Sequence, residues 1–154
     1  MIKAIIFDMD GLMVDTEQLW GDVTRKLAVQ YGIDFDERVR VKMMGKRDYE
    51  ALSVFKEYFN IDASVEELIK VRRKMVLEDM SLVKVNKGLY ELLDLLDKLS
   101  IKKAVATSAF KEFVEKILAV FDLEKRFEAI VMGHEVTHSK PHPEIFLEAA
   151  KKLG

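Results

Sequence analysis

A short apolar run that ends in two acidic residues is the most constraining feature of the chain. Residues 2–7 read Ile-Lys-Ala-Ile-Ile-Phe, and Asp8, Asp10 and Gly11 follow. Such a run suits a strand buried on both faces of a parallel sheet, and open α/β folds place their chemistry at the carboxyl ends of these strands. Because side chains alternate in extended backbone, Asp8 and Asp10 should point the same way. Gly11 then permits a sharp turn, although an Asp-x-Asp pair alone is also compatible with an ordinary solvated turn.

The remaining chain contains a long helical block followed by alternating helices and strands. In the block, apolar residues recur at helical spacing from Glu17 to Tyr31, and Ser64 to Glu67 form a capping box that opens a later helix. Beyond it, we expect strands at 103–107 and 129–133 and helices from Leu89, at about 109–121 and from Pro143 to Leu153.

This order of elements predicts an α/β fold with two domains. The core comprises residues 1–15 and 83–154, and contains a parallel sheet. An all-helical domain, residues 16–82, is inserted after the first strand.

Composition narrows the class of protein. The 154 residues are 49% hydrophobic and 34% charged, which is typical of a globular protein, and no apolar run reaches membrane-spanning length. A net charge of -2 gives no electrostatic footprint for nucleic acid. The chain has no cysteine, so we expect no disulfides and a cytoplasmic location.

The segment Asp8–Glu17, Asp-Met-Asp-Gly-Leu-Met-Val-Asp-Thr-Glu, resembles the first motif of the haloacid dehalogenase (HAD) superfamily. An EF-hand loop is excluded because Gly11 stands fourth from Asp8 rather than sixth. The resemblance implies a Rossmann-like core with a helical cap and a Mg²⁺-dependent phosphatase or phosphomutase. It assigns Asp8 as the nucleophile that forms an aspartyl-phosphate and Asp10 as the general acid and base. Mg²⁺ would bind the Asp8 side chain and the Asp10 backbone carbonyl.

Two further segments resemble HAD motifs. Thr107 matches the hydroxyl residue of the second motif, and Ser108 and Ala109 are expected to begin a helix whose N-terminal amides suit a phosphate. Ser108 could also serve only as a helix N-cap. Ser139–Phe146 resembles the third motif, in which Lys140 would neutralise charge shared by the nucleophile and the phosphoryl group, although a lone lysine before a helix is usually solvated.

Three histidines, His134, His138 and His142, are spaced by four residues. On one helix this spacing could form a metal-binding face. Pro141 and Pro143 break any such helix, so we expect loop or surface histidines rather than a zinc site.

Residues of the helical domain bear on the substrate. Trp20 stands where β-phosphoglucomutases have a histidine used in the mutase cycle, which favours a phosphatase of a small phosphorylated metabolite, a sugar phosphate, over a phosphomutase. A dehalogenase is disfavoured because that branch lacks the acid at Asp10. Gly45, Lys46 and Arg47 resemble the family's specificity loop, but the two cations could equally form a solvated pair. Residues 72–74 are expected to form a solvated helix face.

The fourth HAD motif, acids that follow a further strand and complete the Mg²⁺ site, has no counterpart before Gly154. We therefore expect a core that is incomplete at its C-terminus, a truncated chain, and a first strand with an uncovered edge. Such an edge favours self-association. A catalytically silent fragment that associates through this edge is the non-enzyme alternative.

Overall fold

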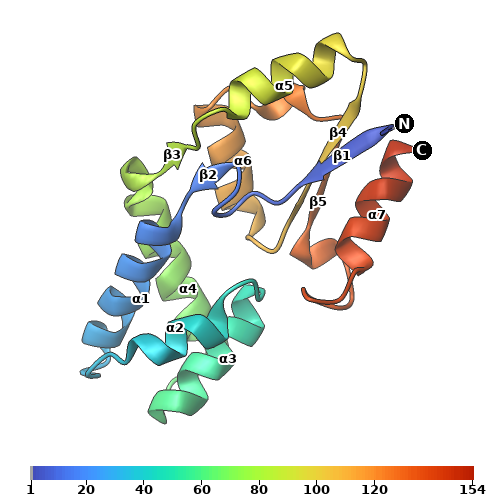
Figure 1. Ribbon diagram of the computed structural model, residues 1–154. Coiled ribbons are helices and arrows are strands. Elements are labelled where there is room, and N and C mark those ends of the chain that lie inside the picture. Colours follow the sequence, from blue (N-terminus) through green and yellow to red (C-terminus); the bar gives the residue numbers. More distant parts are fainter. Residues whose placement is uncertain (1) are drawn as a thin grey trace. The chain divides into compact units, whose positions relative to one another are not determined.

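The computed structural model describes residues 2–154 and divides into two compact units (Figure 1). The core unit consists of the chain up to Asp15 together with Lys84–Gly154, and the helical unit is Thr16–Val83. The second boundary lies one residue after the division expected from the sequence.

Three parallel strands form the sheet of the core unit in the order β1-β4-β5. They are β1 (Ala4–Phe7), β4 (Lys102–Thr107) and β5 (Ala129–Met132), which confirms the predicted α/β fold with a parallel sheet. In this register Phe7 pairs with Val105, and Thr107 pairs with Met132. The carboxyl ends of the three strands therefore lie side by side, and among the described strands β1 forms one edge of this sheet.

Three helices follow the strands of the core unit: α5 (Leu89–Lys98), α6 (Lys111–Val120) and α7 (Glu144–Leu153). Figure 1 shows α7 on one side of the sheet and α5 and α6 on the other. Ile145 and Ala149 of α7 pack with Ala104 and Ala106 of β4 in one buried cluster. The short 3₁₀ turns η2 (Glu124–Arg126) and η3 (Gly133–Glu135) flank β5. Helix α7 begins one residue later than predicted, with Pro143 as its N-cap rather than its first residue.

A second, two-stranded pairing was not predicted. Strand β2 (Val14–Asp15) runs antiparallel to β3 (Lys84–Val85), where the chain leaves and re-enters the core unit. The Asn86 side chain donates to the carbonyl of Leu12 at 2.8 Å, which fastens the same two segments. Gly11 has a φ of +75°, a conformation that favours glycine, and makes the predicted turn before β2. Strands of two residues are too short to show the period-two pattern by which strands are recognised.

The helical unit contains only helices, as the sequence indicates. They are α1 (Glu17–Gln30), α2 (Glu37–Met43), α3 (Asp48–Phe59), α4 (Val65–Glu78) and the 3₁₀ turn η1 (Met80–Leu82). Their buried core is built around Leu27, Leu52, Phe55 and Leu68.

Arg72 is not on a solvated face, contrary to the expectation for residues 72–74. Its side chain is buried, its Nη1 lies 3.2 Å from Asp48 Oδ1, and its guanidinium lies 4.6 Å from the centre of the Trp20 ring. Helix α4 packs against both α1 and α3, so position 72 faces its neighbours and the long side chain supplies packing as well as charge.

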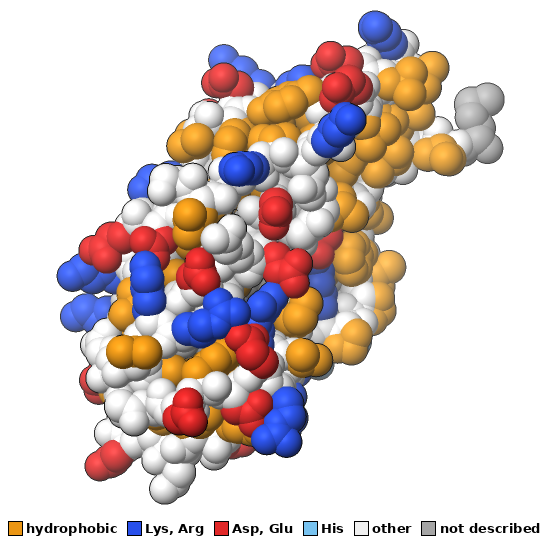
Figure 2. Space-filling view, turned by 60° about the vertical axis from the view of Figure 1, so that its left-hand side comes forward, with side chains coloured by type: hydrophobic (Ala, Val, Ile, Leu, Met, Phe, Trp, Pro, Cys, Tyr) orange, Lys and Arg blue, Asp and Glu red, His pale blue; other side chains and the backbone are white. Residues whose placement is uncertain are grey.

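The surface carries both signs of charge. Figure 2 shows Lys and Arg side chains interspersed with Asp and Glu side chains over one face. Among the described residues, none of the helices combines the length and apolar character that crossing a membrane requires.

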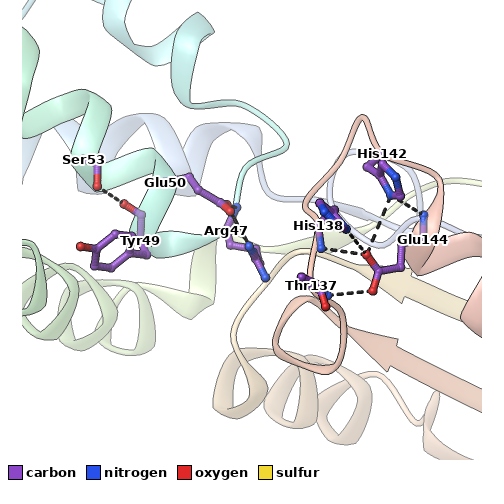
Figure 3. Close-up of polar contacts among 8 residues, drawn as sticks. All are labelled: Arg47, Tyr49, Glu50, Ser53, Thr137, His138, His142 and Glu144. Carbon is purple, nitrogen blue, oxygen red and sulfur yellow. Dashed lines mark hydrogen bonds and ion pairs between the residues drawn. The ribbon is translucent and has the colours of Figure 1, made fainter.

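Alanine variants of two serines in the helical unit test whether Ser64 stabilises the start of α4. Ser64 is the N-cap of α4 and its Oγ accepts from the Glu67 N–H at 3.1 Å, whereas Ser53 lies inside α3 and donates to the Tyr49 carbonyl at 2.7 Å (Figure 3). Ser64→Ala should lower the free energy of unfolding by about 1 kcal/mol because one amide loses its partner. Ser53→Ala should change it by less than about 0.5 kcal/mol. Urea unfolding of both variants measures the difference, and equal losses would contradict the capping role.

Candidate active site

The predicted catalytic residues of the core unit meet at the carboxyl ends of its strands. Asp8 directly follows β1, Thr107 ends β4, and Lys140 lies in the segment between β5 and α7. The strand pairing brings the first two together, and the loop returns the lysine to them from 132 residues away in sequence.

Lys140 joins the ends of β1 and β4. Its Nζ donates to Asp8 Oδ1 at 2.8 Å and to the Ala106 carbonyl at 3.0 Å, and it lies 5.0 Å from the centre of the Phe146 ring. The Met9 N–H donates to the same Asp8 oxygen at 2.9 Å. The Lys140 side chain is only 15% exposed, whereas that of Asp8 is 40% exposed. A cation is thus held against a carboxylate that solvent can still reach.

Asp10 and Thr107 form the second pair. Thr107 is fully buried, and its hydroxyl lies 3.4 Å from Asp10 Oδ2, the longer end of hydrogen-bonding distance. The same hydroxyl oxygen accepts from the Ala109 N–H at 3.1 Å, which fixes its position. Met9 is fully buried between Asp8 and Asp10, which are both partly exposed, so the two carboxylates lie on the opposite side of the chain from Met9.

Ser108 does not begin a helix or cap one. Helix α6 starts at Lys111 and its N-cap is Phe110, so Ser108 and Ala109 lie in a loop before the helix. The Ala109 amide turns back to Thr107 instead of continuing into helical backbone. This local bond competes with helix formation and delays the start of α6. Any phosphate contact at Ser108 would therefore use loop groups rather than the first turn of the helix.

Glu144 organises the loop that carries Lys140, although no role for it was expected from the sequence. Its Oε1 accepts from the Thr137 N–H and its Oε2 from the His138 N–H, both at 2.8 Å (Figure 3). Those two amides, together with the His138 ring, lower the pKa of the Glu144 carboxyl to about 2. The available signal was an acid in the first turn of a predicted helix, where carboxylates often bind preceding amides.

The predicted specificity residues lie in the helical unit. Gly45 and Lys46 are exposed, and Gly45 has a φ of +73°. Arg47 is the N-cap of α3, and its guanidinium binds the Glu50 carboxylate, as Figure 3 shows. Trp20 is partly buried and packs against the Arg72 guanidinium. Of the two basic residues expected to contact the substrate, Arg47 therefore forms a local ion pair, whereas Lys46 lies on the surface.

The donors at the strand ends suit Mg²⁺. The Asp8 carboxylate and the Asp10 backbone carbonyl offer hard oxygens, and the Met9 N–H and the Lys140 ammonium both bind Asp8 on Oδ1. Mg²⁺ prefers oxygen ligands and keeps several waters, so it needs only a few protein donors and an accessible site. Asp8 and Asp10 are both partly exposed, which meets that requirement.

Comparison with known proteins identifies the family. The haloacid dehalogenase-like hydrolase family matches residues 5–154, nearly the whole chain. The chain belongs to this family.

Relatives in the family include named phosphatases. The chain is 36% identical over 156 residues to the phosphorylated carbohydrates phosphatase of Thermotoga maritima, a match that covers 99% of this chain and 71% of that protein. It is 29% identical to hexitol phosphatase B of Escherichia coli K12, over 99% of this chain and 70% of that protein.

A solved relative has the same fold. The crystal structure of β-phosphoglucomutase from Clostridium difficile is 26% identical and superposes with a TM-score of 0.88, over 99% of this chain and 71% of that one. These matches confirm the predicted membership of the HAD superfamily, in the branch that contains β-phosphoglucomutases and sugar-phosphate phosphatases, and the predicted fold.

The Glu144 carboxylate should make the loop before α7 sensitive to acid. Its pKa in the folded chain, about 2, is below the ordinary value of 4.5, so its contribution to loop order is complete above pH 4.5 and is lost as the pH falls towards 2. We expect the protection of the Thr137 and His138 amides, taken as the intrinsic exchange rate at each pH divided by the observed rate, to fall over that range. Glu144→Gln, which replaces one acceptor oxygen by an amide NH2 group, should remove the protection of at least one of these amides already at neutral pH, whereas Glu148→Gln, on the same helix, should not. Hydrogen exchange followed by NMR measures this, and slow exchange in Glu144→Gln would contradict it.

Proposed function

We propose that this protein is a Mg²⁺-dependent phosphatase that hydrolyses a small phosphorylated metabolite, in particular a sugar phosphate, through an aspartyl-phosphate on Asp8. The observation that carries the proposal is the contact of 2.8 Å between Lys140 and Asp8 at the carboxyl end of β1, with Asp10 and Thr107 beside them. The phosphatases among the relatives support the same reaction class.

Asp8 supplies the nucleophile. One carboxylate oxygen attacks phosphorus, the bond from phosphorus to the ester oxygen breaks, and the phosphoryl group is left on Asp8 as an acyl phosphate. The Met9 N–H and the Lys140 ammonium both bind Oδ1, and they fix the orientation of the carboxyl group for this attack.

Asp10 moves the proton. As a neutral acid it protonates the departing ester oxygen, and as the resulting carboxylate it accepts a proton from the water that attacks the acyl phosphate. The Thr107 hydroxyl, fixed by the Ala109 N–H, is in position to donate to a phosphoryl oxygen or to Asp10. One residue can serve both steps because the proton given in the first is recovered in the second.

Lys140 and the metal ion would neutralise the negative charge of Asp8 and of the phosphoryl group. The ammonium already rests on Asp8, so it neutralises the carboxylate before attack and the phosphoryl oxygens afterwards without reorganising. Bound Mg²⁺, held by Asp8 and the Asp10 backbone carbonyl, would supply electrostatic stabilisation of the transferring phosphoryl group.

Trp20 favours a phosphatase over a phosphomutase, although the chain also superposes on a β-phosphoglucomutase. An indole has one N–H donor and cannot take up a proton as the mutase histidine does. The Trp20 ring is also covered by Arg72, which gives it a packing role in the helical unit. For contact with the substrate, we propose Lys46, and Gly45 as the residue that permits its turn, ahead of Arg47, which is paired with Glu50.

Variants of the two aspartates test the proposal. Asp8→Asn should abolish Mg²⁺-dependent phosphate release and the binding of beryllofluoride, which adds to a nucleophilic carboxylate and is detected by ¹⁹F NMR independently of turnover. Asp10→Asn should slow turnover by about 10²- to 10⁴-fold, because proton transfer is lost. Asp122→Asn, the same change at a left-handed position that tolerates asparagine, is the control. Beryllofluoride binding by Asp8→Asn, or none by the unaltered chain, would refute the assignment of the nucleophile.

Lys140 should act through its charge. Lys140→Met should lower kcat by about 10²- to 10³-fold, as expected for loss of one preorganised donor, and Lys140→Arg should restore part of the rate because the charge is kept but the ammonium geometry is not. Lys151→Met, which removes an exposed lysine of α7, should have no effect. Steady-state phosphate release measures all three, and an unchanged kcat in Lys140→Met would exclude this role.

A further inference from the structure

Two of the three histidines in the chain come together with a carboxylate in the loop before α7. One ligand atom each from His138, His142 and Glu144 lie within 4.8 Å of one another (Figure 3). The His138 and His142 rings are 4.5 Å apart between centres and inclined by 34°. The turn through Pro141 creates this cluster. A spacing of four residues brings side chains together on a helix, but the prolines exclude a helix here, so the spacing did not predict the cluster. His134 lies outside the cluster, on η3.

The carboxylate is fixed while the rings are accessible. Both Glu144 oxygens are held by backbone amides at 2.8 Å, so the carboxylate is a preformed and ionised ligand. His138 Nδ1 lies 2.7 Å from Glu144 Oε2, and His142 Nδ1 lies 3.9 Å from the same oxygen. Both rings are exposed, and exposed side chains change rotamer within nanoseconds.

These distances need only a small adjustment to surround an ion. Ligands bound at 2.0–2.2 Å in tetrahedral geometry stand about 3.4 Å apart. The pair at 2.7 Å must open by about 0.7 Å and the pair at 3.9 Å must close by about 0.5 Å to reach that spacing. Rotation of the two exposed rings can supply both changes while the Glu144 carboxylate stays in place, and His142 Nδ1 then exchanges its hydrogen bond from the Glu144 N–H for the ion.

The ligand set selects the class of metal. Two imidazoles and one carboxylate suit Zn²⁺ and neighbouring transition metals, and three protein ligands leave the fourth position to water. Mg²⁺ prefers oxygen ligands, as offered by Asp8 and Asp10. We propose that His138, His142 and Glu144 form a binding site for a transition-metal ion of the Zn²⁺ class, separate from the carboxylates at the strand ends.

Binding at this site fastens the loop on both sides of Lys140. An ion shared by residues 138 and 142 closes a short ring of chain that contains Ser139, Lys140 and Pro141, and so restricts the conformations of that segment. The amides of Ser139 and Lys140 should therefore exchange more slowly when Zn²⁺ is bound. This effect does not depend on the proposed phosphatase activity.

Calorimetric titration of the full chain with Zn²⁺, in excess Mg²⁺ and without a polyhistidine tag, tests the site. His142→Asn should weaken Zn²⁺ binding at least tenfold, since a lost ligand should cost no less than the 10- to 100-fold typical of a lost outer-shell partner. Asparagine can still accept from the Glu144 N–H as His142 Nδ1 does at 3.2 Å, so the loop should be retained. His134→Asn is the matched control, and Asp8→Asn tests whether the ion sits at the strand ends. Both should bind Zn²⁺ as the unaltered chain does.

The outcomes separate the alternatives. Loss of Zn²⁺ binding in His142→Asn alone, together with slower exchange of the Ser139 and Lys140 amides on adding Zn²⁺, supports the site. Equal loss in His134→Asn, loss in Asp8→Asn, or binding unchanged in His142→Asn overturns it, as does the absence of any binding by the unaltered chain. If the contact between the histidines and Glu144 only shapes the loop, the unaltered chain should bind no Zn²⁺.

Discussion

The parallel pairing of β1 with β4 is the constraint on which the candidate site depends. Because Phe7 pairs with Val105, Asp8 emerges beside Ala106, and one ammonium can bind the carboxylate of the first and the carbonyl of the second. A mostly buried lysine is unfavourable unless its charge and donors are satisfied, and charge-assisted bonds are the strong ones. A slip of the register by one residue would separate these acceptors and leave Lys140 without one of them.

Packing of α7 against the parallel sheet sets where Lys140 lies. Helix α7 is anchored by Ile145 and Ala149 against β4, which fixes Glu144 at its first residue. Glu144 then holds the amides of Thr137 and His138, so the loop that contains Lys140 is closed at its base. The position of the Lys140 ammonium thus follows from apolar burial of α7 and from one carboxylate at the start of that helix, which itself makes no contact with Asp8.

Features that depend on neighbouring residues in the chain were predicted correctly from the sequence. Predictions failed where contacts between distant segments determine the structure. The buried strands, the helical block and the strand-end acids follow from apolar periodicity and motif, and Lys140 followed from resemblance. The predicted start of α6 was wrong because a hydrogen bond from the Ala109 N–H to the Thr107 hydroxyl competes with the helix. The burial of Arg72 depends on two other helices, and the pairing of β2 with β3 joins segments almost seventy residues apart in strands too short to show a pattern. Proline correctly excluded a histidine helix but could not reveal a turn that brings two rings together.

Two carboxylates bind different side chains of the loop. Lys140 turns to Asp8, whereas the rings on either side of it in sequence, His138 and His142, turn to Glu144. A lysine and a metal ion in one short loop would repel each other if they shared a carboxylate. Because Lys140 and the two rings contact different carboxylates, the proposed phosphoryl site at the strand ends and the proposed imidazole-rich site beside it are electrostatically compatible. Metals that prefer one ligand set gain little from the other, so the two proposed sites would not compete for the same ion.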